Sequence, residues 1–182
     1  MQLTLVAPGF YQLSNVFDDR FLIQLLREFS HASQWEMLTT TSKNKSTRYQ
    51  LGLHLNSELA QEINHALLPV QIFAENQIAH ELYQNSPQLW EDTAGYINEP
   101  HCDVSPNLVV NVQVYLSTSS TDNTGTCCLI DGTWYSVPYR ANAGYVMFQP
   151  TQVQHGMQHP VVDQRRSLYQ SYRATVEASP VW

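Results

Sequence analysis

Two histidines and one aspartate, His101, Asp103 and His155, are the residues of this 182-residue chain best suited by type and order to bind a metal. Two imidazoles and a carboxylate form a facial ligand set that holds a divalent transition metal such as Fe(II) and leaves other coordination positions open. In an extended segment, residues i and i+2 point to the same side, so His101 and Asp103 can reach one ion. The third ligand must come from a second segment, and His155 follows about fifty residues later in a strand-like stretch.

A basic group follows ten positions after His155, in the sequence Arg165-Arg166-Ser167. Strand alternation puts Arg165 and Ser167 on one face and Arg166 on the other. A guanidinium grips a carboxylate with two parallel hydrogen bonds, and a hydroxyl adds a third donor. We therefore favour Arg165 as the anchor for a carboxylate ligand held beside the metal, and Arg166 remains the alternative.

Five segments between residues 96 and 172 carry these residues in a characteristic order. The segments are 96–103 (Tyr-Ile-Asn-Glu-Pro-His-Cys-Asp), 108–116, 144–148 (Gly-Tyr-Val-Met-Phe), 155–161 and 165–168. Together they resemble the Fe(II)- and 2-oxoglutarate-dependent oxygenases, most closely the prolyl-hydroxylase-like branch. The resemblance covers under half of the chain and includes each expected catalytic position.

The resemblance implies a reaction and a set of site residues. The cofactor is Fe(II), the co-substrates are 2-oxoglutarate and O2, and a C–H bond is hydroxylated with release of succinate and CO2. The implied catalytic residues are His101, Asp103 and His155, which hold the metal, and Arg165. The implied co-substrate-binding residues are Arg165, Ser167, Tyr115, Tyr96 and Asn111.

Two departures from the family pattern leave choices open. Residues 124–128 read Thr-Gly-Thr-Cys-Cys where the branch usually has Gly-Gly, and Pro160 comes one position late after His155. The late proline keeps Arg166 in consideration beside Arg165. The substrate also stays open between a small molecule, a free amino acid and a peptidyl residue.

The segment 108–116 alternates apolar residues on one face with Val109, Asn111, Gln113 and Tyr115 on the other. One interpretation is a half-buried strand whose polar face meets water. The other places that polar face inside a barrel, where Asn111 and Gln113 line a cavity and Tyr115 reaches the co-substrate beside Arg165.

The order of elements predicts an α+β fold with a double-stranded β-helix core of the jelly-roll, cupin-like type and N-terminal helices packed on it. We expect one domain over 1–182, with 1–90 as a helical support region and 91–176 as the catalytic core. The expected strands of the core are 93–98, 101–104, 108–116, 126–130, 134–137, 144–149, 152–158 and 166–176. In the first half we expect a strand at 3–6, a helix at 15–30 capped by Ser14 or Asn15, a loop at 39–47, and helix over 56–84 that opens at Asn56 or Ser57 and is interrupted by Pro69.

Several further residues have competing interpretations. His159 is the rival to His155, but it directly precedes Pro160 and is expected at a strand end. A zinc site formed by Cys127 and Cys128 is disfavoured because strand neighbours face opposite ways. Trp134 and Tyr139 are candidates for the cavity edge, and 117–125 is either a plain loop or a flap. We interpret His31, His54, His65 and His80 as surface or packing residues.

The net charge and the small number of basic residues argue against a nucleic-acid partner. The net charge is −7, and Lys and Arg together number only nine, so no basic stripe is available for a nucleic-acid backbone. We expect no nucleic-acid partner and no membrane span, and the oligomeric state is not predicted. Three cysteines do not suggest a disulfide framework, and the start of the sequence does not read as a signal peptide, so a cytoplasmic setting is expected.

The sequence permits two other functions. One is a cupin-like metal-binding or non-catalytic β-helix protein that lacks 2-oxoglutarate turnover. The other is a purely structural or binding module without a tight metal. Arg165-x-Ser167 favours the oxygenase, because a plain metal site does not need it.

Overall fold

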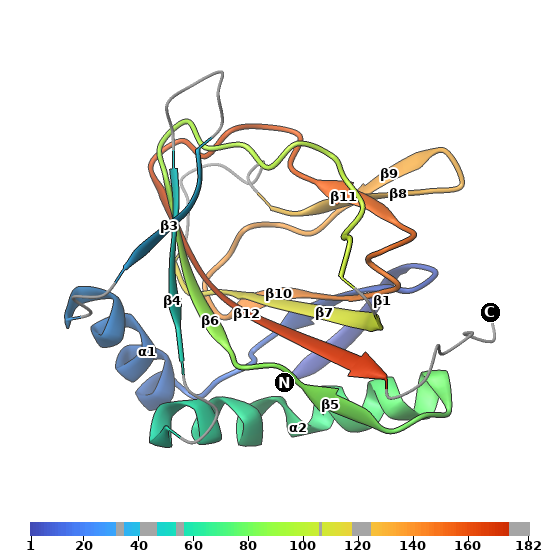
Figure 1. Ribbon diagram of the computed structural model, residues 1–182, viewed down its shortest axis with the longest axis horizontal. Helices are drawn as coiled ribbons and strands as arrows, with labels where there is room; N and C mark the ends of the chain where they lie inside the picture. The colour runs from blue at the N-terminus through green and yellow to red at the C-terminus, as the bar shows by residue number, and fades with distance from the viewer. Residues whose placement is uncertain (32–34, 41–46, 54–56, 106, 118–124, 175–182) are drawn as a thin grey trace.

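The computed structural model describes residues 1–31, 35–40, 47–53, 57–105, 107–117 and 125–174. These residues form a large and a small antiparallel sheet with two helices (Figure 1). Both helices lie on one side of the large sheet, and the small sheet lies on the other side.

The large sheet has nine strands and combines both halves of the chain. Along its main path the order is β1 (Gln2–Ala7), β2 (Phe10–Ser14), β10 (Ala143–Phe148), β7 (Leu108–Tyr115), β12 (Gln164–Ala174), β6 (Gln88–Thr93), β4 (Thr47–Gly52) and β3 (Glu36–Thr40), while β5 (Leu82–Gln84) also pairs with β12. The small sheet has the order β11 (Gln154–Gly156), β8 (Cys127–Ile130) and β9 (Thr133–Ser136).

Helix α1 (Asp19–His31) begins later than expected. The backbone N–H of Phe21 donates to the carboxylate of Asp18 at 2.8 Å, so Asp18 satisfies the first turn. Asn15, one of the two expected caps, has a φ of 51°, in the left-handed region, and Ser14 belongs to β2. The expected caps were therefore wrong, because the chain turns between β2 and the helix.

Helix α2 (Glu58–Ile78) is one continuous helix, capped at Ser57, whose hydroxyl accepts from the Ala60 N–H at 3.2 Å. The expected interruption at Pro69 does not occur. Pro69 is exposed, so the carbonyl that lacks its usual N–H partner can be hydrated by solvent. Buried Leu67 and Val70 on the other side hold the helix against the sheet.

Strand β7 is buried on both faces, which favours the interpretation of its polar side as interior. Val110, Val112 and Val114 belong to the same apolar cluster as buried residues of both helices, such as Leu25 and Leu67. The opposite face carries Asn111 and Gln113, which point away from the helices into the space between the two sheets. The side chains that could bind a ligand are therefore displayed on the concave side of the large sheet.

The first half of the chain contributes more than helices. Strands β1 to β5 and the start of β6 come from residues 1–90, in addition to α1 and α2. The expected loop at 39–47 overlaps β3 and β4, and its residues 41–46 lie outside the described residues. The expected strand 93–98 is mostly absent because the strand is β6, which ends at Thr93, and the expected strand 101–104 is reduced to one β-bridge at His101.

Candidate metal and co-substrate site

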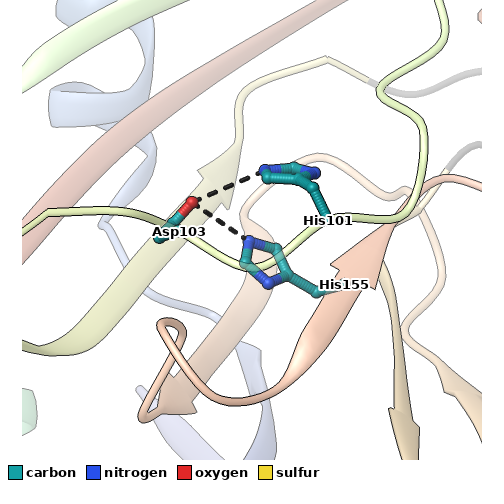
Figure 2. Close-up of side chains that lie close together, drawn as sticks. All are labelled: His101, Asp103 and His155. Atoms are coloured by element: carbon teal, nitrogen blue, oxygen red, sulfur yellow. Dashed lines mark ion pairs between the residues drawn. The ribbon is translucent and has the colours of Figure 1, made fainter.

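His101, Asp103 and His155 converge on one point (Figure 2). The backbones of the two histidines form a β-bridge, with His101 N–H donating to the His155 carbonyl at 2.9 Å and the reverse bond at 2.8 Å. The Asp103 N–H donates to the carbonyl of Pro150 at 2.9 Å, which fixes the third ligand on the same side. One ligand atom from each of the three residues lies within 4.8 Å of the others.

The donor atoms lie close to the spacing that a shared metal would impose. The Asp103 carboxylate oxygen Oδ1 lies 3.5 Å from His101 Nε2 and 3.6 Å from His155 Nε2. Two atoms that each lie ~2.1 Å from one metal are roughly 3 to 3.5 Å apart. The observed distances are also longer than the roughly 2.8 Å of a charge-assisted hydrogen bond.

Both imidazoles have their other ring nitrogen fixed by a backbone carbonyl. His101 Nδ1 donates to the Glu99 carbonyl at 2.8 Å, and His155 Nδ1 donates to the Val153 carbonyl at 2.9 Å. Because a carbonyl only accepts, Nδ1 carries the proton and Nε2 of the neutral ring is left with its lone pair. Such carbonyl contacts orient metal-binding histidines and set their tautomer.

The carboxylate of Asp103 is ionised at neutral pH. Burial alone would raise its pKa, but the neighbouring His101 and His155 rings, in their protonated form, and the hydrogen bond from Asn111 lower the pKa below its usual range. The pKa of His101 is raised, chiefly because the Asp103 carboxylate stabilises the protonated ring. The carboxylate thus supplies a negative charge to which protons and metal cations compete to bind.

Asn111 holds the aspartate in place. Its side-chain amide donates to Asp103 Oδ2 at 2.6 Å, and its carbonyl oxygen accepts from the Tyr169 hydroxyl at 2.7 Å. Oδ2 is thereby engaged, so Oδ1 is left facing the two imidazoles. Asn111, expected beside the co-substrate, is therefore also a positioning residue for the carboxylate.

A cavity of about 140 Å³ opens beside the three candidate ligands. We call it the central cavity. Its polar and charged lining residues are Arg48, Asn98, His101, Asp103, Asn111, Gln113, Thr126, His155 and Arg165, and its remaining lining residues are Trp90, Tyr96, Tyr145, Gly156, Met157 and Tyr169.

Arg165 lines the central cavity from β12 and is only 2% exposed. Its Nε and Nη2 each lie 2.8 Å from Oδ2 of the fully buried Asp92 on β6. A second arginine, Arg48 of β4, binds the same carboxylate through Nε at 2.6 Å and Nη2 at 3.0 Å. Burial would raise the pKa of Asp92, but the two guanidiniums lower it, so this carboxyl group is ionised.

Arg166 lies on the other face of β12, as strand alternation predicts. Its guanidinium pairs with Glu91 at 3.0 Å and lies over the ring of Phe29, with 5.3 Å from its Cζ to the ring centroid. It does not line the central cavity. Of the two adjacent arginines, Arg165 alone is placed with the candidate metal ligands.

Tyr115 and Ser167 are buried next to the central cavity without lining it. The Tyr115 hydroxyl donates to Thr126 Oγ1 at 3.1 Å, and Ser167 Oγ accepts from the Gln113 amide at 2.8 Å. The side chains that face the cavity here are Thr126 and Gln113. Their own hydrogen bond, from Thr126 Oγ1 to Gln113 Oε1, is 3.3 Å long.

The sequence does not predict a site role for Thr126, although its segment departs from the family pattern. Gly125 explains why the chain approaches so closely there. A Cβ at Gly125 would lie 1.7 Å from the Val137 carbonyl oxygen, so only glycine fits. The Gly-Thr sequence was the available signal, but its side-chain direction was not evident without the strand pairing.

Several other residues considered from the sequence neither join the candidate ligand set nor line the central cavity. His159 is exposed, as are His31, His65 and His80, while His54 is outside the described residues. Cys102 is exposed, Cys127 and Cys128 are buried, and among the described residues the metal-binding group contains no cysteine. Neither Trp134, which is 38% exposed, nor the buried Tyr139 lines the central cavity, so both guesses for its edge were wrong. Residues 118–124 of the expected loop or flap lie outside the described residues.

Comparison by sequence identifies no relative: no protein-family model matches the chain, and no curated protein matches it. Neither helix in the described part of the chain is long and apolar enough to cross a bilayer.

Comparison by structure finds many similar folds. A prolyl-4-hydroxylase from Pseudomonas putida matches with a TM-score of 0.73 and 14% identity, covering 92% of this chain and 94% of that one. HygX from Streptomyces hygroscopicus, solved with nickel and 2-oxoglutarate bound, matches with a TM-score of 0.68 and 14% identity over 92% and 83% of the two chains. The non-haem α-ketoglutarate-dependent epimerase SnoN of nogalamycin biosynthesis matches with a TM-score of 0.72 and 13% identity over 96% and 86%.

These proteins belong to one class. The chain has the fold of the Fe(II)- and 2-oxoglutarate-dependent oxygenases, and the prolyl hydroxylases are among its structural neighbours. Neighbours were crystallised with iron or nickel and with 2-oxoglutarate, and here three candidate metal ligands converge beside a cavity.

Proposed function

We propose that this chain is an Fe(II)- and 2-oxoglutarate-dependent dioxygenase that hydroxylates a C–H bond of a small molecule, an amino acid or a peptidyl residue. The observation that carries the proposal is one cavity lined by both a 2-His-1-carboxylate set and a buried arginine. A plain metal-binding protein has no use for Arg165 in that place. The cupin-like, non-catalytic alternative is therefore not favoured.

His101, Asp103 and His155 would hold the iron. The donor set suits it, since two neutral imidazoles and one carboxylate are the ligands of non-haem Fe(II) oxygenases. Their Nε2 and Oδ1 atoms face one another without a proton between them when Nδ1 is protonated, an arrangement that a cation stabilises. When bound, the metal supplies the chemistry that couples oxidative decarboxylation of 2-oxoglutarate to oxidation of the substrate.

Arg165 would anchor the far carboxylate of 2-oxoglutarate. Its guanidinium is held by Asp92, so its direction is set before the ligand arrives. Thr126, Gln113 and Tyr96 line the same cavity and would contact the co-substrate's chain. Tyr115 and Ser167, which sequence reasoning placed in contact, would act from behind through hydrogen bonds to Thr126 and Gln113.

The remaining lining residues would keep the reaction away from bulk water. Tyr145 and Met157 are buried, and Trp90 stacks on Tyr169 with 4.2 Å between ring centroids. Water exclusion strengthens the contacts between charged groups and protects reactive species from side reactions.

We also infer that the two sheets form a double-stranded β-helix, the jelly-roll core expected from the sequence. The small sheet faces the concave side of the large one, and His155 on β11 meets His101 there. Hydroxylation is the outcome we propose for the substrate. One neighbour is an epimerase, so the products must be identified as well as the succinate.

Turnover with a substrate panel tests the proposal. The purified protein, supplied with Fe(II), ascorbate and 2-oxoglutarate, is expected to release succinate, faster with amino acids, peptides or small metabolites that bind. A product heavier by one oxygen atom would confirm hydroxylation. Succinate release equal in the wild type and in Asp103→Ala would contradict the proposal.

A further inference from the structure

Arg48 is the charged residue of the central cavity to which the proposed reaction gives no role. It enters from β4, is 5% exposed, and lies at register with Asp92 on the neighbouring strand. Its Cζ lies 4.1 Å from the centroid of the Trp90 ring and 4.8 Å from that of Tyr96. Two aromatic faces and a carboxylate thus fix this guanidinium in the wall of the cavity.

Three consecutive strands bring Arg48, Asp92 and Arg165 together as one charge cluster. Arg48 pairs with Asp92 across β4 and β6, and Asp92 pairs with Arg165 across β6 and β12. Oδ2 of Asp92 accepts from both arginines, while Oδ1 accepts from Arg48. The carboxylate is shared, so neither arginine has it exclusively.

The charges of the cluster do not cancel. Two guanidiniums carry two positive charges and Asp92 carries one negative charge, which leaves one positive charge in a buried wall. A carboxylate bound against these three residues would neutralise that excess charge. Without Arg48, Asp92 would neutralise Arg165, and a carboxylate ligand would bring a surplus negative charge.

We infer that Arg48 is a positioning and charge-balancing residue for the co-substrate: it satisfies Asp92 so that Arg165 keeps its positive charge for the far carboxylate of 2-oxoglutarate. This inference rests on the proposed function. Asp92 then orients both arginines, and Arg48 sets the net charge of this three-residue cluster.

The test compares two ligands that differ only in the far carboxylate. They are 2-oxoglutarate and 2-oxopentanoate, which has the same five-carbon 2-oxo acid chain without the second acid group. Dissociation constants are measured by calorimetry on Mn(II)-loaded protein, without turnover. The ratio of the two constants reports the contribution of the far carboxylate alone.

The wild type is expected to prefer 2-oxoglutarate, and Arg48→Gln should reduce this preference by about tenfold or more. Arg48→Lys, which keeps the charge, should retain most of it. The double variant Arg48→Gln/Asp92→Asn should recover most of it as well, because Arg165 again supplies one net positive charge. The matched control Arg166→Gln/Glu91→Gln changes the equivalent half-buried pair outside the cavity and should leave the ratio unchanged.

Recovery in the double variant separates charge balance from a merely structural role, since two cluster substitutions would damage packing more than one. An unchanged ratio in Arg48→Gln, or a double variant as weak as the single one, overturns the inference. If Arg165→Gln abolishes the preference and Arg48→Gln does not reduce it, the proposed function stands and only the inference about Arg48 fails. A wild type that shows no preference for 2-oxoglutarate contradicts both.

Discussion

The two candidate metal-binding histidines are joined by a backbone β-bridge, and both rings face the carboxylate of Asp103. Their bridge fixes the separation of their ring centroids at 4.6 Å, and each Nδ1 is fixed by a carbonyl. Asp103 comes from the same extended segment as His101 and is oriented by Asn111. The site therefore depends on few side-chain rotations, and we regard it as pre-arranged for a cation.

Replacing any one of the three ligands should abolish metal binding. His101→Ala, Asp103→Ala and His155→Ala each remove one donor, and the loss should exceed the roughly 10- to 100-fold effect of disturbing a neighbour of a metal ligand. The matched control is His159→Ala, because His159 is exposed and four residues from His155. Fe(II) binding under anaerobic conditions measures this, and full binding by the His155 variant would contradict the assignment.

The two adjacent arginines should differ strongly in their effect on 2-oxoglutarate. Arg165→Ala is expected to weaken the apparent affinity about 30-fold or more, since truncating one partner of a buried charged pair costs roughly 2–5 kcal/mol. Arg166→Ala should change it little, because Arg166 pairs with Glu91 outside the cavity. The dependence of the rate on 2-oxoglutarate concentration gives both values. A larger effect at Arg166 would reverse the assignment.

Pairings between distant strands place the charged wall of the cavity. Arg48, Asp92 and Arg165 come from β4, β6 and β12, which are neighbours in the sheet and far apart in sequence. The alternation of β12 was readable, so the direction of Arg165 could be predicted from Arg165-x-Ser167. The direction of Arg48 could not be predicted, because it directly follows the polar stretch 39–47 and its strand β4 becomes evident only from the pairing with β6.

Dependence on pairing between distant strands also explains which other elements the sequence did not predict. Apolar periodicity identified α1, α2 and most later strands, since those patterns depend on local burial. It did not identify the strands β2 to β5, which are short and gain their stability from neighbours in the sheet. The expected helix over 56–84 therefore ran too far, because α2 ends at Ile78 and residues 82–84 form β5. The convergence of His101, Asp103 and His155 was predictable from residue type and spacing, whereas the placement of Thr126 and Asn111 depends on contacts between strands.

A glycine where β10 meets β7 should be essential to the sheet. A Cβ at position 144 would lie 1.9 Å from the Gln113 carbonyl oxygen, so Gly144→Ala must push the two strands apart. We expect a loss of about 1–3 kcal/mol of unfolding free energy, as for other overpacked sites. Urea denaturation measures it, with Gly52→Ala as control, because a Cβ at Gly52 meets nothing within 4 Å. Equal stability of the two variants would contradict this close approach.

The acidic net charge of the whole molecule disfavours nucleic acids as substrates. A net charge of −7 with only nine Lys and Arg is unfavourable for binding a phosphate backbone. Two of the nine, Arg48 and Arg165, are committed to Asp92 inside the protein. A substrate small enough to reach a cavity of about 140 Å³, or a peptide side chain, fits the site better than a nucleic acid.

We therefore predict no action on nucleic acids. Titration with single- and double-stranded oligonucleotides at near-physiological salt should show no micromolar binding, and succinate release should not rise when they are added. A neutral or basic peptide of similar size serves as the comparison. Micromolar affinity together with oligonucleotide-stimulated turnover would overturn this prediction.

We propose above all that one cavity holds Fe(II) through His101, Asp103 and His155 together with 2-oxoglutarate through Arg165. The most direct measurement is the visible absorption of the protein after anaerobic addition of both. We predict a weak metal-to-ligand charge-transfer band that needs Fe(II) and 2-oxoglutarate together, is absent in His155→Ala, and requires much more 2-oxoglutarate in Arg165→Ala. A wild-type protein that shows no band, or a His155→Ala protein that shows the same band, would contradict the account.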